Sequence, residues 1–306
     1  MTFSDFWPNY IKQKMVVAKS TTICAYTLCW RSHLRSYFGD VEIEDIKNSF
    51  IQNYINEGLQ EGRNTKCIRD EITLLKNIIK SYAIFTDKPY YSPIVIWPSR
   101  AKVGEIKKRE KYDSVDFERL VSFCKDSPKH WHKAIALACM TGMRIGEVCG
   151  IRFSDFDFER HIVRVQRTVG REYWGAGHSE LYVNTTKTIC SNRVIPIPEW
   201  LCLYYMNYQK LYGLSDDAYI TPGEKSPFIE PRTMRSKFAR LCKEIGVEYK
   251  TFHSLRHTYA SRLLMSNVDV RTAAELLGHS DVAMTLNVYA HSDDSAKFDA
   301  AKKIFL

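Results

Sequence analysis

The chain has 306 residues, of which 45% are hydrophobic, and it carries a formal net charge of +9 at pH 7. This length favours two domains, and this hydrophobic content is ordinary for a globular protein that buries real cores. The basic balance favours a polyanionic partner such as nucleic acid. No apolar run approaches the roughly 18 residues of a membrane span, and the N-terminal stretch MTFSDFWPNY lacks the pattern of a signal peptide. We therefore expect no secretion, no membrane span and a cytoplasmic location.

Nine cysteines are scattered along the sequence, and no two of them form a C-x-x-C pair. Several lie in apolar helical runs, such as Cys139 in AIALACM. This usage fits buried, reduced thiols and argues against a disulfide framework or a zinc site. The sequence also lacks a glycine-rich phosphate loop.

Residues 1–97 have the periodicity of helices, because apolar and aromatic residues recur every three or four positions. The pattern predicts four helices, at 3–15, 19–40, 45–59 and 64–85. Ser20 or Thr21 is the expected N-cap of the second helix, and Gly39 is its expected end. Four helices with short polar connections indicate a small bundle.

A basic linker is expected at 98–112. The preceding stretch KPYYSPIVIWPSR interrupts the helical pattern with three prolines, and RAKVGEIKKREK then holds six basic and two acidic residues. Lys107, Lys108 and Arg109 are candidate DNA contacts. A solvated charged connector has the same composition, so both interpretations stay open.

The region from residue 113 is helical to about Cys149, then forms strands, and returns to helix after Pro198. Alternating, β-branched patterns predict strands at 161–169, 180–188 and 192–198, the last two joined as a hairpin. The expected fold class is therefore mainly α (α+β). A helical N-terminal bundle precedes a mixed helical domain with a small three-stranded antiparallel sheet.

The pattern H-x-x-R occurs twice, and local structure separates the two copies. His161 and Arg164 lie in the predicted strand 161–169, where residues three apart point to opposite faces and cannot converge on one ligand. His253 and Arg256 open the predicted helix HSLRHTYASRLLM, where residues three apart share a face. Only the second pair can form one site.

Two further stretches offer chemistry to that site. In ACMTGMRIGEV, Gly142 allows a tight turn, and Arg144 follows it at the start of a helix, where free N–H groups attract anions. Glu147 lies three residues on and can hold the guanidinium. Lys187 lies near the tip of the predicted hairpin, where it can act as a mobile proton donor. A solvated turn lysine explains the same pattern.

The stretch AAELLGHSDVAMTLNVYAH supplies the last two candidates. Gly278 is expected to end one helix, His279 to lie in the turn, and Ser280 or Asp281 to cap the next helix. Tyr289 lies ten residues beyond His279 on that second helix. Taken singly, a tyrosine on an apolar helix is usually a core residue.

The order Arg, Lys, His-x-x-Arg, Gly-His, Tyr at these spacings resembles the tyrosine recombinase (phage integrase) family. The matching stretches are TGMRIGE, TKT with NRVIPIP, HSLRHTYAS, LLGHSD and LNVYAH, which span roughly 113–295. Residues 3–85 resemble the helical core-binding domain of the family more weakly, through ST…Y and the YFGD ending. The resemblance implies a core-binding (SAM-like) DNA-binding domain at 1–97. It implies a catalytic domain at 113–306 with a C-terminal exchange segment at about 292–306.

The resemblance also implies a metal-free reaction that cuts and rejoins DNA. Tyr289 matches the nucleophile, which forms a 3′-phosphotyrosyl link and so conserves the energy of the phosphodiester. Arg144 and Arg256 match the two arginines that clamp the phosphate, because guanidinium binds two oxygens and stays charged. Lys187 matches the lysine that protonates the departing 5′-hydroxyl.

Three other positions complete the implied site. His253 matches the histidine that takes the tyrosine proton or contacts the phosphate. His279 matches a second histidine, which hydrogen-bonds a non-bridging oxygen. Glu147 matches a supporting acidic position, and His257 is interpreted as a structural neighbour.

The implied partners are double-stranded DNA attachment or crossover sites. The family works as a homotetramer on two sites, passes through a Holliday junction and uses no cofactor. Accessory directionality or DNA-bending proteins are candidate further partners. The C-terminal segment is expected to dock on a neighbouring subunit, although packing on its own domain is a second interpretation.

Several functions stay open within this resemblance. The interval of ten residues between His279 and Tyr289, and a hairpin without a G-K-G turn, favour an integrase of a phage or conjugative transposon. An Xer-type dimer-resolving recombinase is the alternative. Many integrases carry an additional N-terminal arm-binding domain, and we expect none before Phe3. A non-cleaving DNA-binding regulator and a type IB topoisomerase are interpretations from other classes.

Overall fold

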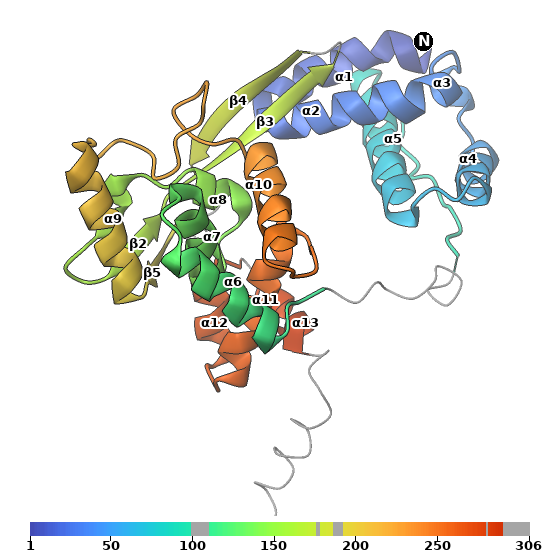
Figure 1. Ribbon diagram of the computed structural model, residues 1–306. Coiled ribbons are helices and arrows are strands. Elements are labelled where there is room, and N and C mark those ends of the chain that lie inside the picture. The colour runs from blue at the N-terminus through green and yellow to red at the C-terminus, as the bar shows by residue number, and fades with distance from the viewer. Residues whose placement is uncertain (99–109, 176–177, 186–191, 280, 290–306) are drawn as a thin grey trace, which may run out of the picture. The chain divides into compact units, whose positions relative to one another are not determined.

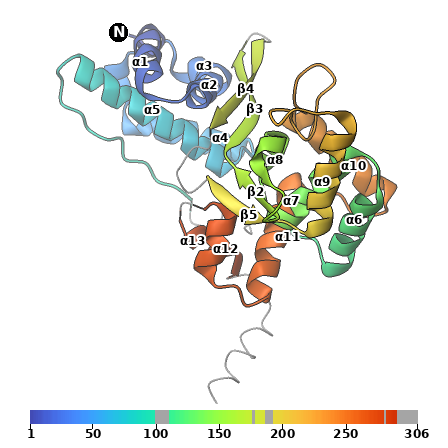
Figure 2. The ribbon, with the colours of Figure 1, turned by 90° about the vertical axis from the view of Figure 1, so that its left-hand side faces the viewer.

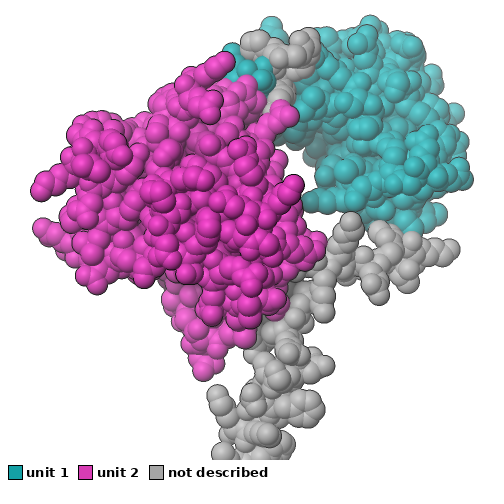
Figure 3. Space-filling model, viewed as in Figure 1, with its two compact units in different colours: residues 1–107, 172–180 teal, residues 108–171, 181–306 magenta. Residues whose placement is uncertain are grey.

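The fold is taken from a computed structural model, which describes residues 1–98, 110–175, 178–185, 192–279 and 281–289 (Figure 1). The chain divides into two compact units, shown in different colours in Figure 3. Unit 1 consists of Met1–Lys107 and Glu172–Glu180, and unit 2 of Lys108–Arg171 and Leu181–Leu306. No helix in the described part of the chain is long and apolar enough to cross a membrane.

Helices make up the N-terminal part of unit 1, as predicted. They are α1 (Phe3–Val17), α2 (Ser20–Cys29), η1 (Trp30–Leu34), α3 (Arg35–Phe38), η2 (Ile43–Asp45), α4 (Asn48–Gln60) and α5 (Thr65–Phe85). The second predicted helix forms as α2 and α3, joined by the π-helical segment η1. Its core is rich in aromatic side chains, among them Phe3, Phe6, Tyr10, Trp30 and Phe38.

The predicted N-cap of α2 is wrong. Lys19 occupies the cap position, and Ser20 is already the first helical residue. The Ser20 hydroxyl donates to the Glu172 carboxylate instead of capping the helix. Gly39 does end α3, but with φ −55° it is not left-handed. A glycine is required there because a Cβ would lie 2.4 Å from the Arg35 carbonyl oxygen.

Unit 2 is built around α7 (His130–Thr141), in which almost every residue is buried. This helix packs against α6 (Ser114–Asp126), α8 (Ile145–Cys149) and α11 (Phe252–Met265). The remaining helical elements are η4 (Phe153–Asp155), α9 (Glu199–Tyr212), α10 (Pro231–Glu244), α12 (Val270–Leu277) and α13 (Ala283–Tyr289). Its small and aliphatic residues from Ala134 to Cys139 are all buried. Figure 2 shows α7 between α8 and α11.

The predicted three-stranded antiparallel sheet is present. It joins β1 (Phe156–Asp157), β2 (Ile162–Val165) and β5 (Arg193–Pro196) in that order, with Val163 opposite Ile195. A separate two-stranded sheet pairs β3 (Arg167–Gly175) with β4 (His178–Thr185).

The predicted strand pairing is wrong within the described residues, because β4 pairs with β3 and not with β5. The predicted strand 161–169 divides after Val165, and its two parts join different sheets. Alternation identifies which face of a strand is buried but not which strand lies beside it. His161 precedes β2 with φ 52° and is therefore not in the strand.

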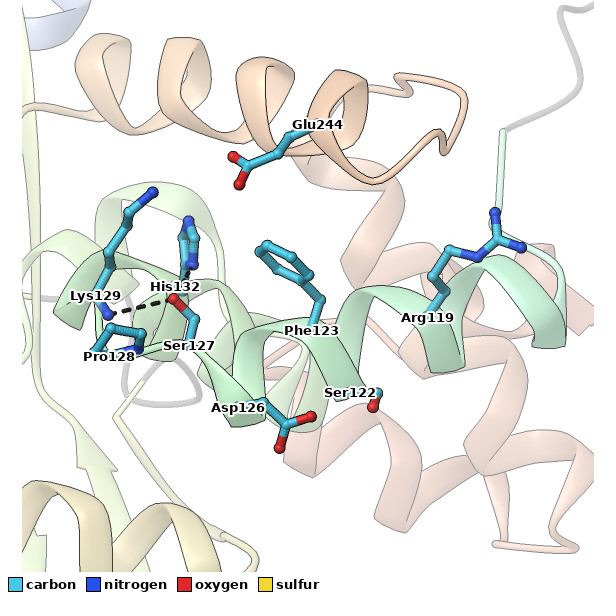
Figure 4. Close-up of a pocket in the computed structure, with 9 residues that line it drawn as sticks. All are labelled: Arg119, Ser122, Phe123, Asp126, Ser127, Pro128, Lys129, His132 and Glu244. Carbon is cyan, nitrogen blue, oxygen red and sulfur yellow. Dashed lines mark hydrogen bonds between the residues drawn. The ribbon is translucent and has the colours of Figure 1, made fainter.

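The junction between α6 and α7 buries two polar side chains. The Lys133 ammonium donates to the carbonyls of Cys124, Lys125 and Ser127 at the end of α6. His132 Nδ1 shares a hydrogen bond of 2.6 Å with the Ser127 hydroxyl. Figure 4 shows this pair at the wall of a cavity of about 640 Å³, beside Phe123. Burial, followed by nearby basic side chains, lowers the pKa of His132 to about 4.

This shift predicts that the protein loses stability as the pH falls from 7 to 5. Between pH 6.5 and 4 the unfolded chain binds a proton at His132 that the folded chain does not, so protonation favours unfolding. The expected loss from this group is about 2 kcal/mol. Urea unfolding of wild type and His132→Asn at pH 7 and pH 5 measures it. The variant should lose correspondingly less, and equal losses in the two proteins would contradict the assignment.

Candidate active site

Four of the residues singled out in the sequence line one pocket of about 390 Å³. They are Arg144, His253, Arg256 and His279, and the other lining residues are His257, Ala260, Leu277 and Met284. The side chains come from the start of α8, from α11, from the end of α12 and from α13. Segments more than 100 residues apart in the sequence therefore converge on one cavity.

Arg144 is placed by a glycine turn. Gly142 ends α7 with φ 62°, a left-handed conformation that glycine adopts without strain, and a Cβ there would lie 2.5 Å from the Tyr259 ring. Arg144 then occupies the N-cap of α8. Its backbone N–H donates to Glu147 Oε2 at 2.9 Å, and its Nη1 donates to Oε1 at 2.8 Å.

Glu147 is a buried carboxylate that binds two arginines. Besides Arg144, it accepts a hydrogen bond of 2.9 Å from Nη2 of Arg193. Burial alone would raise the pKa of Glu147, but Arg193 and Arg144 outweigh it and hold the pKa below its usual value. The carboxylate is therefore ionised at neutral pH and holds the Arg144 guanidinium. The supporting catalytic role of Glu147 stays a prediction.

Arg256 is a buried cation held by carbonyl oxygens. Its Nη1 donates to the Gly142 carbonyl at 2.9 Å, and its Nη2 donates to the Leu277 carbonyl at 2.6 Å. Only 3% of the residue is exposed, and it makes no ion pair with any residue in the described ranges. Burial first, and then the charge of Arg144, lower the pKa of Arg256 to about 9, so the guanidinium stays charged at pH 7.

Three histidines line the same pocket as Arg144 and Arg256. The rings of His253 and His257 meet edge to face with centroids 4.6 Å apart, and both line the pocket. His279 follows Gly278, which ends α12 with φ 66°. Its Nδ1 shares a hydrogen bond of 2.7 Å with the Thr285 hydroxyl of α13. The H-x-x-R pair therefore converges on one cavity, and His257, predicted to be a structural neighbour, also reaches it.

Several predicted positions lie beyond what the structure describes. Lys187, the linker residues Lys107, Lys108 and Arg109, and the C-terminal segment 292–306 lie outside the described residues. Tyr289 is the last residue of α13, and only its backbone is described. The predicted roles of these residues remain predictions.

Sequence reasoning missed Arg193. This side chain is 5% exposed and, besides Glu147, donates from Nε to the Leu276 carbonyl at 2.7 Å. The signal was present, because burial alternates along β5 and Arg193 shares the inward face with Ile195. A charged residue at an inward position of a strand requires a buried partner.

A second missed feature is the basic face of α10. Exposed positions of this helix carry Arg232, Arg235, Arg240 and Lys243, whereas Met234, Phe238 and Leu241 are buried. The helix packs against α8, whose N-cap is Arg144. Arg232 and Arg235 are three apart, as are Arg240 and Lys243, and each of the first two lies eight positions before one of the last two, so the four charges spread over one broad exposed side of the helix. We name Arg232, Arg235, Arg240 and Lys243 the α10 stripe.

Both units of the chain contain sequences that match known protein families. Residues 112–296 match the Phage integrase family, and residues 2–59 match the N-terminal SAM-like domain of phage integrases. A "Tyrosine recombinase XerC-like" protein of Caldanaerobacter subterraneus subsp. tengcongensis is 27% identical, covering 90% of this chain and 76% of its own length. A tyrosine recombinase of Pseudothermotoga lettingae is 23% identical, covering 87% and 85%.

Solved structures share the fold. The Tn1549 transposon integrase in complex with transposon right end DNA has a TM-score of 0.79 at 21% identity, and the match covers 100% of both chains. A lambda integrase tetramer bound to a Holliday junction has a TM-score of 0.65 at 18% identity, covering 94% of this chain and 77% of that one. Since the family match spans more than half of the 306 residues, the chain belongs to the phage integrase family of tyrosine recombinases.

Proposed function

We propose that this protein is a site-specific integrase that cleaves and rejoins DNA through a 3′-phosphotyrosyl intermediate, and so integrates or excises a mobile element. The observation that carries the proposal is the charge imbalance at the pocket. Arg144 and Arg256 line the pocket with two guanidinium groups, and none of its described lining residues is a carboxylate. A phosphodiester bound in this pocket supplies the missing negative charge.

Tyr289 is the proposed nucleophile. Position 289 lies one helical turn after Thr285, whose hydroxyl is bonded to His279 at the pocket. Positions four apart share a face of a helix, which supports placing residue 289 on the pocket side of α13. Helix α13 also contributes Met284 to the pocket lining.

In the proposed reaction, the phenol oxygen of Tyr289 bonds to phosphorus while the bond from phosphorus to the 5′ oxygen breaks. His253 accepts the phenol proton, and Lys187 donates a proton to the departing 5′ oxygen. Arg144, Arg256 and His279 stabilise the charge that develops on the non-bridging oxygens. Attack by a 5′-hydroxyl of another strand reverses these steps and rejoins the DNA, so the reaction requires no metal and no nucleotide.

We also propose how the chain is divided into domains and which partners it binds. Residues 1–97 form the core-binding domain, 98–112 the linker with Lys107, Lys108 and Arg109 as DNA contacts, and 113–306 the catalytic domain, acting in the cytoplasm. Since the lambda integrase neighbour is a tetramer on a Holliday junction, we extend that assembly and double-stranded attachment sites to this chain. The exchange segment 292–306 then links subunits.

An Xer-type role in resolving chromosome dimers is the second candidate. The relative from Caldanaerobacter is named XerC-like, which favours it. The DNA that is recombined separates the two functions. An integrase joins the ends of an element to a target, whereas a dimer-resolving enzyme recombines two copies of one chromosomal site.

The central prediction is that the protein forms a covalent adduct with DNA in EDTA. A nicked duplex carrying a candidate site from the DNA flanking the gene traps cleavage, because the short 5′ product diffuses away and cannot religate. A denaturing gel should show a protein–DNA band for wild type and none for Tyr289→Phe, which lacks the attacking oxygen.

Site binding by both proteins is the control for this experiment, since the Phe variant keeps the pocket arginines. Specific binding by wild type without any adduct would sink the cleavage mechanism. It would make a non-cleaving DNA-binding regulator the better description of this chain.

The α10 stripe is the proposed DNA contact outside the pocket. Four exposed basic side chains on one face suit a row of phosphates, and the helix that carries them packs on α8, where Arg144 begins the pocket. Because each neutralised phosphate releases counterions, such contacts weaken as the salt concentration rises.

We expect Arg235→Gln with Arg240→Gln to flatten the salt dependence of DNA binding. The slope of log affinity against log salt should fall in magnitude by about 0.9 for each phosphate that the variant no longer neutralises. Fluorescence anisotropy between 50 and 300 mM salt measures this slope, at roughly the range over which such contacts dominate. As a control, Lys210→Gln removes an exposed charge on α9 and should leave the slope unchanged. If the double variant has the wild-type slope, the α10 stripe does not contact DNA phosphates.

A further inference from the structure

Arg193 connects the strand β5 to two separate parts of the pocket. From β5 its Nη2 reaches Glu147 Oε2 at 2.9 Å, and its Nε reaches the Leu276 carbonyl at 2.7 Å. The first contact lies at the start of α8, and the second lies at the end of α12. One guanidinium therefore bridges three elements that are distant in the sequence.

Each of these two contacts involves a group that also contacts, or adjoins a residue that contacts, one of the arginines proposed to bind the phosphate. Glu147 also binds the backbone N–H and Nη1 of Arg144. Leu276 precedes Leu277, whose carbonyl accepts the hydrogen bond from Arg256, and His279 follows two residues later. Arg193 and Arg256 therefore hold consecutive carbonyls at the end of α12, and a shift of Arg193 changes the position of both arginines.

The chemistry of this contact requires arginine. The guanidinium is planar, and its Nε and Nη2 donate in two fixed directions, one to a carboxylate and one to a carbonyl. A lysine ammonium offers a point charge on a flexible stem, so it can neutralise Glu147 without fixing both directions. A buried ion pair is also weak evidence for a stabilising role, since replacing it by apolar residues of the same volume often leaves the stability of a protein unchanged or raises it.

We propose that Arg193 is a positioning residue for the phosphate clamp, acting through Glu147 on Arg144 and through the end of α12 on Arg256 and His279. This inference rests on the proposed function, because its readout is DNA cleavage. Arg193 aligns the clamp with the scissile phosphate and does not itself bind the phosphate. Misplacement of a clamp by about 1 Å costs roughly 100-fold in rate when groups must be aligned.

A matched comparison is available in the same unit. Arg167 donates from Nη1 to Asp155, a carboxylate that is 1% exposed, so this is a second arginine bound to a buried carboxylate, with 18% of the Arg167 side chain exposed. Neither Arg167 nor Asp155 lines the pocket. Substituting Arg167 tests what loss of an arginine bound to a buried carboxylate does to stability and folding alone.

The experiment measures two quantities for wild type, Arg193→Lys, Arg193→Met, Arg167→Lys and Arg167→Met. The first is the single-turnover rate of covalent adduct formation on the nicked duplex at saturating protein. The second is the dissociation constant for the same duplex. We expect both Arg193 variants to cut the rate by about 10- to 100-fold while the dissociation constant changes less than threefold. The Arg167 variants should keep the wild-type rate.

A double-variant cycle tests the route through Glu147. In a Glu147→Gln background the hold on Arg144 is already weakened, so Arg193→Met should cost a smaller factor in rate than it does in wild type. The lysine variant keeps the positive charge and serves if the methionine variant fails to fold.

The possible results separate the two proposals. A wild-type protein that binds DNA without forming an adduct overturns the proposed function, and this inference with it. A wild-type adduct together with equal rates for the Arg193 and Arg167 variants overturns only the positioning role. Equal factors for Arg193→Met in both backgrounds would show that Arg193 does not act through Glu147.

Discussion

The buried guanidinium of Arg256 is the interaction on which the site depends. It is held by the carbonyls of Gly142 and Leu277, which lie at the C-terminal ends of α7 and α12. Such ends carry partial negative charge, because their last carbonyls lack partners within the helix. These carbonyls stabilise the cation but leave its positive charge in place. A carboxylate would neutralise that charge. The charge of Arg256 therefore stays available for an anion in the pocket.

This arrangement also explains why two left-handed glycines border the site. Gly142 ends α7 at φ 62° and Gly278 ends α12 at φ 66°, so each helix stops at the carbonyl that Arg256 requires. The same turns then place Arg144 at the N-cap of α8 and His279 beside α13. Each glycine thus does two things, ending a helix and introducing the next functional side chain.

The sequence predicted the parts of the site that depend on local rules. Helical spacing brought His253 and Arg256 to one face, and a glycine turn placed Arg144, because both are set within a few residues. Strand partners depend on contacts across the fold, and the sequence predicted the pairing of β4 incorrectly. Arg193 was missed for a related reason. Its partners, Glu147 and Leu276, are distant in the sequence, so no local pattern shows what a buried arginine on β5 binds.

Buried charges in this unit are held in two ways, by an opposite charge or by carbonyl oxygens. The buried carboxylate Asp155 binds Arg167, and the buried ammonium of Lys133 is surrounded by three carbonyls. At the pocket, Glu147 binds both Arg144 and Arg193, while Arg256, like Lys133, is held by carbonyls and makes no ion pair with a described residue. Arg256 differs from Lys133 in that it lines a pocket together with Arg144, His253 and His279, which supports the proposal that this site binds the phosphate of a DNA strand.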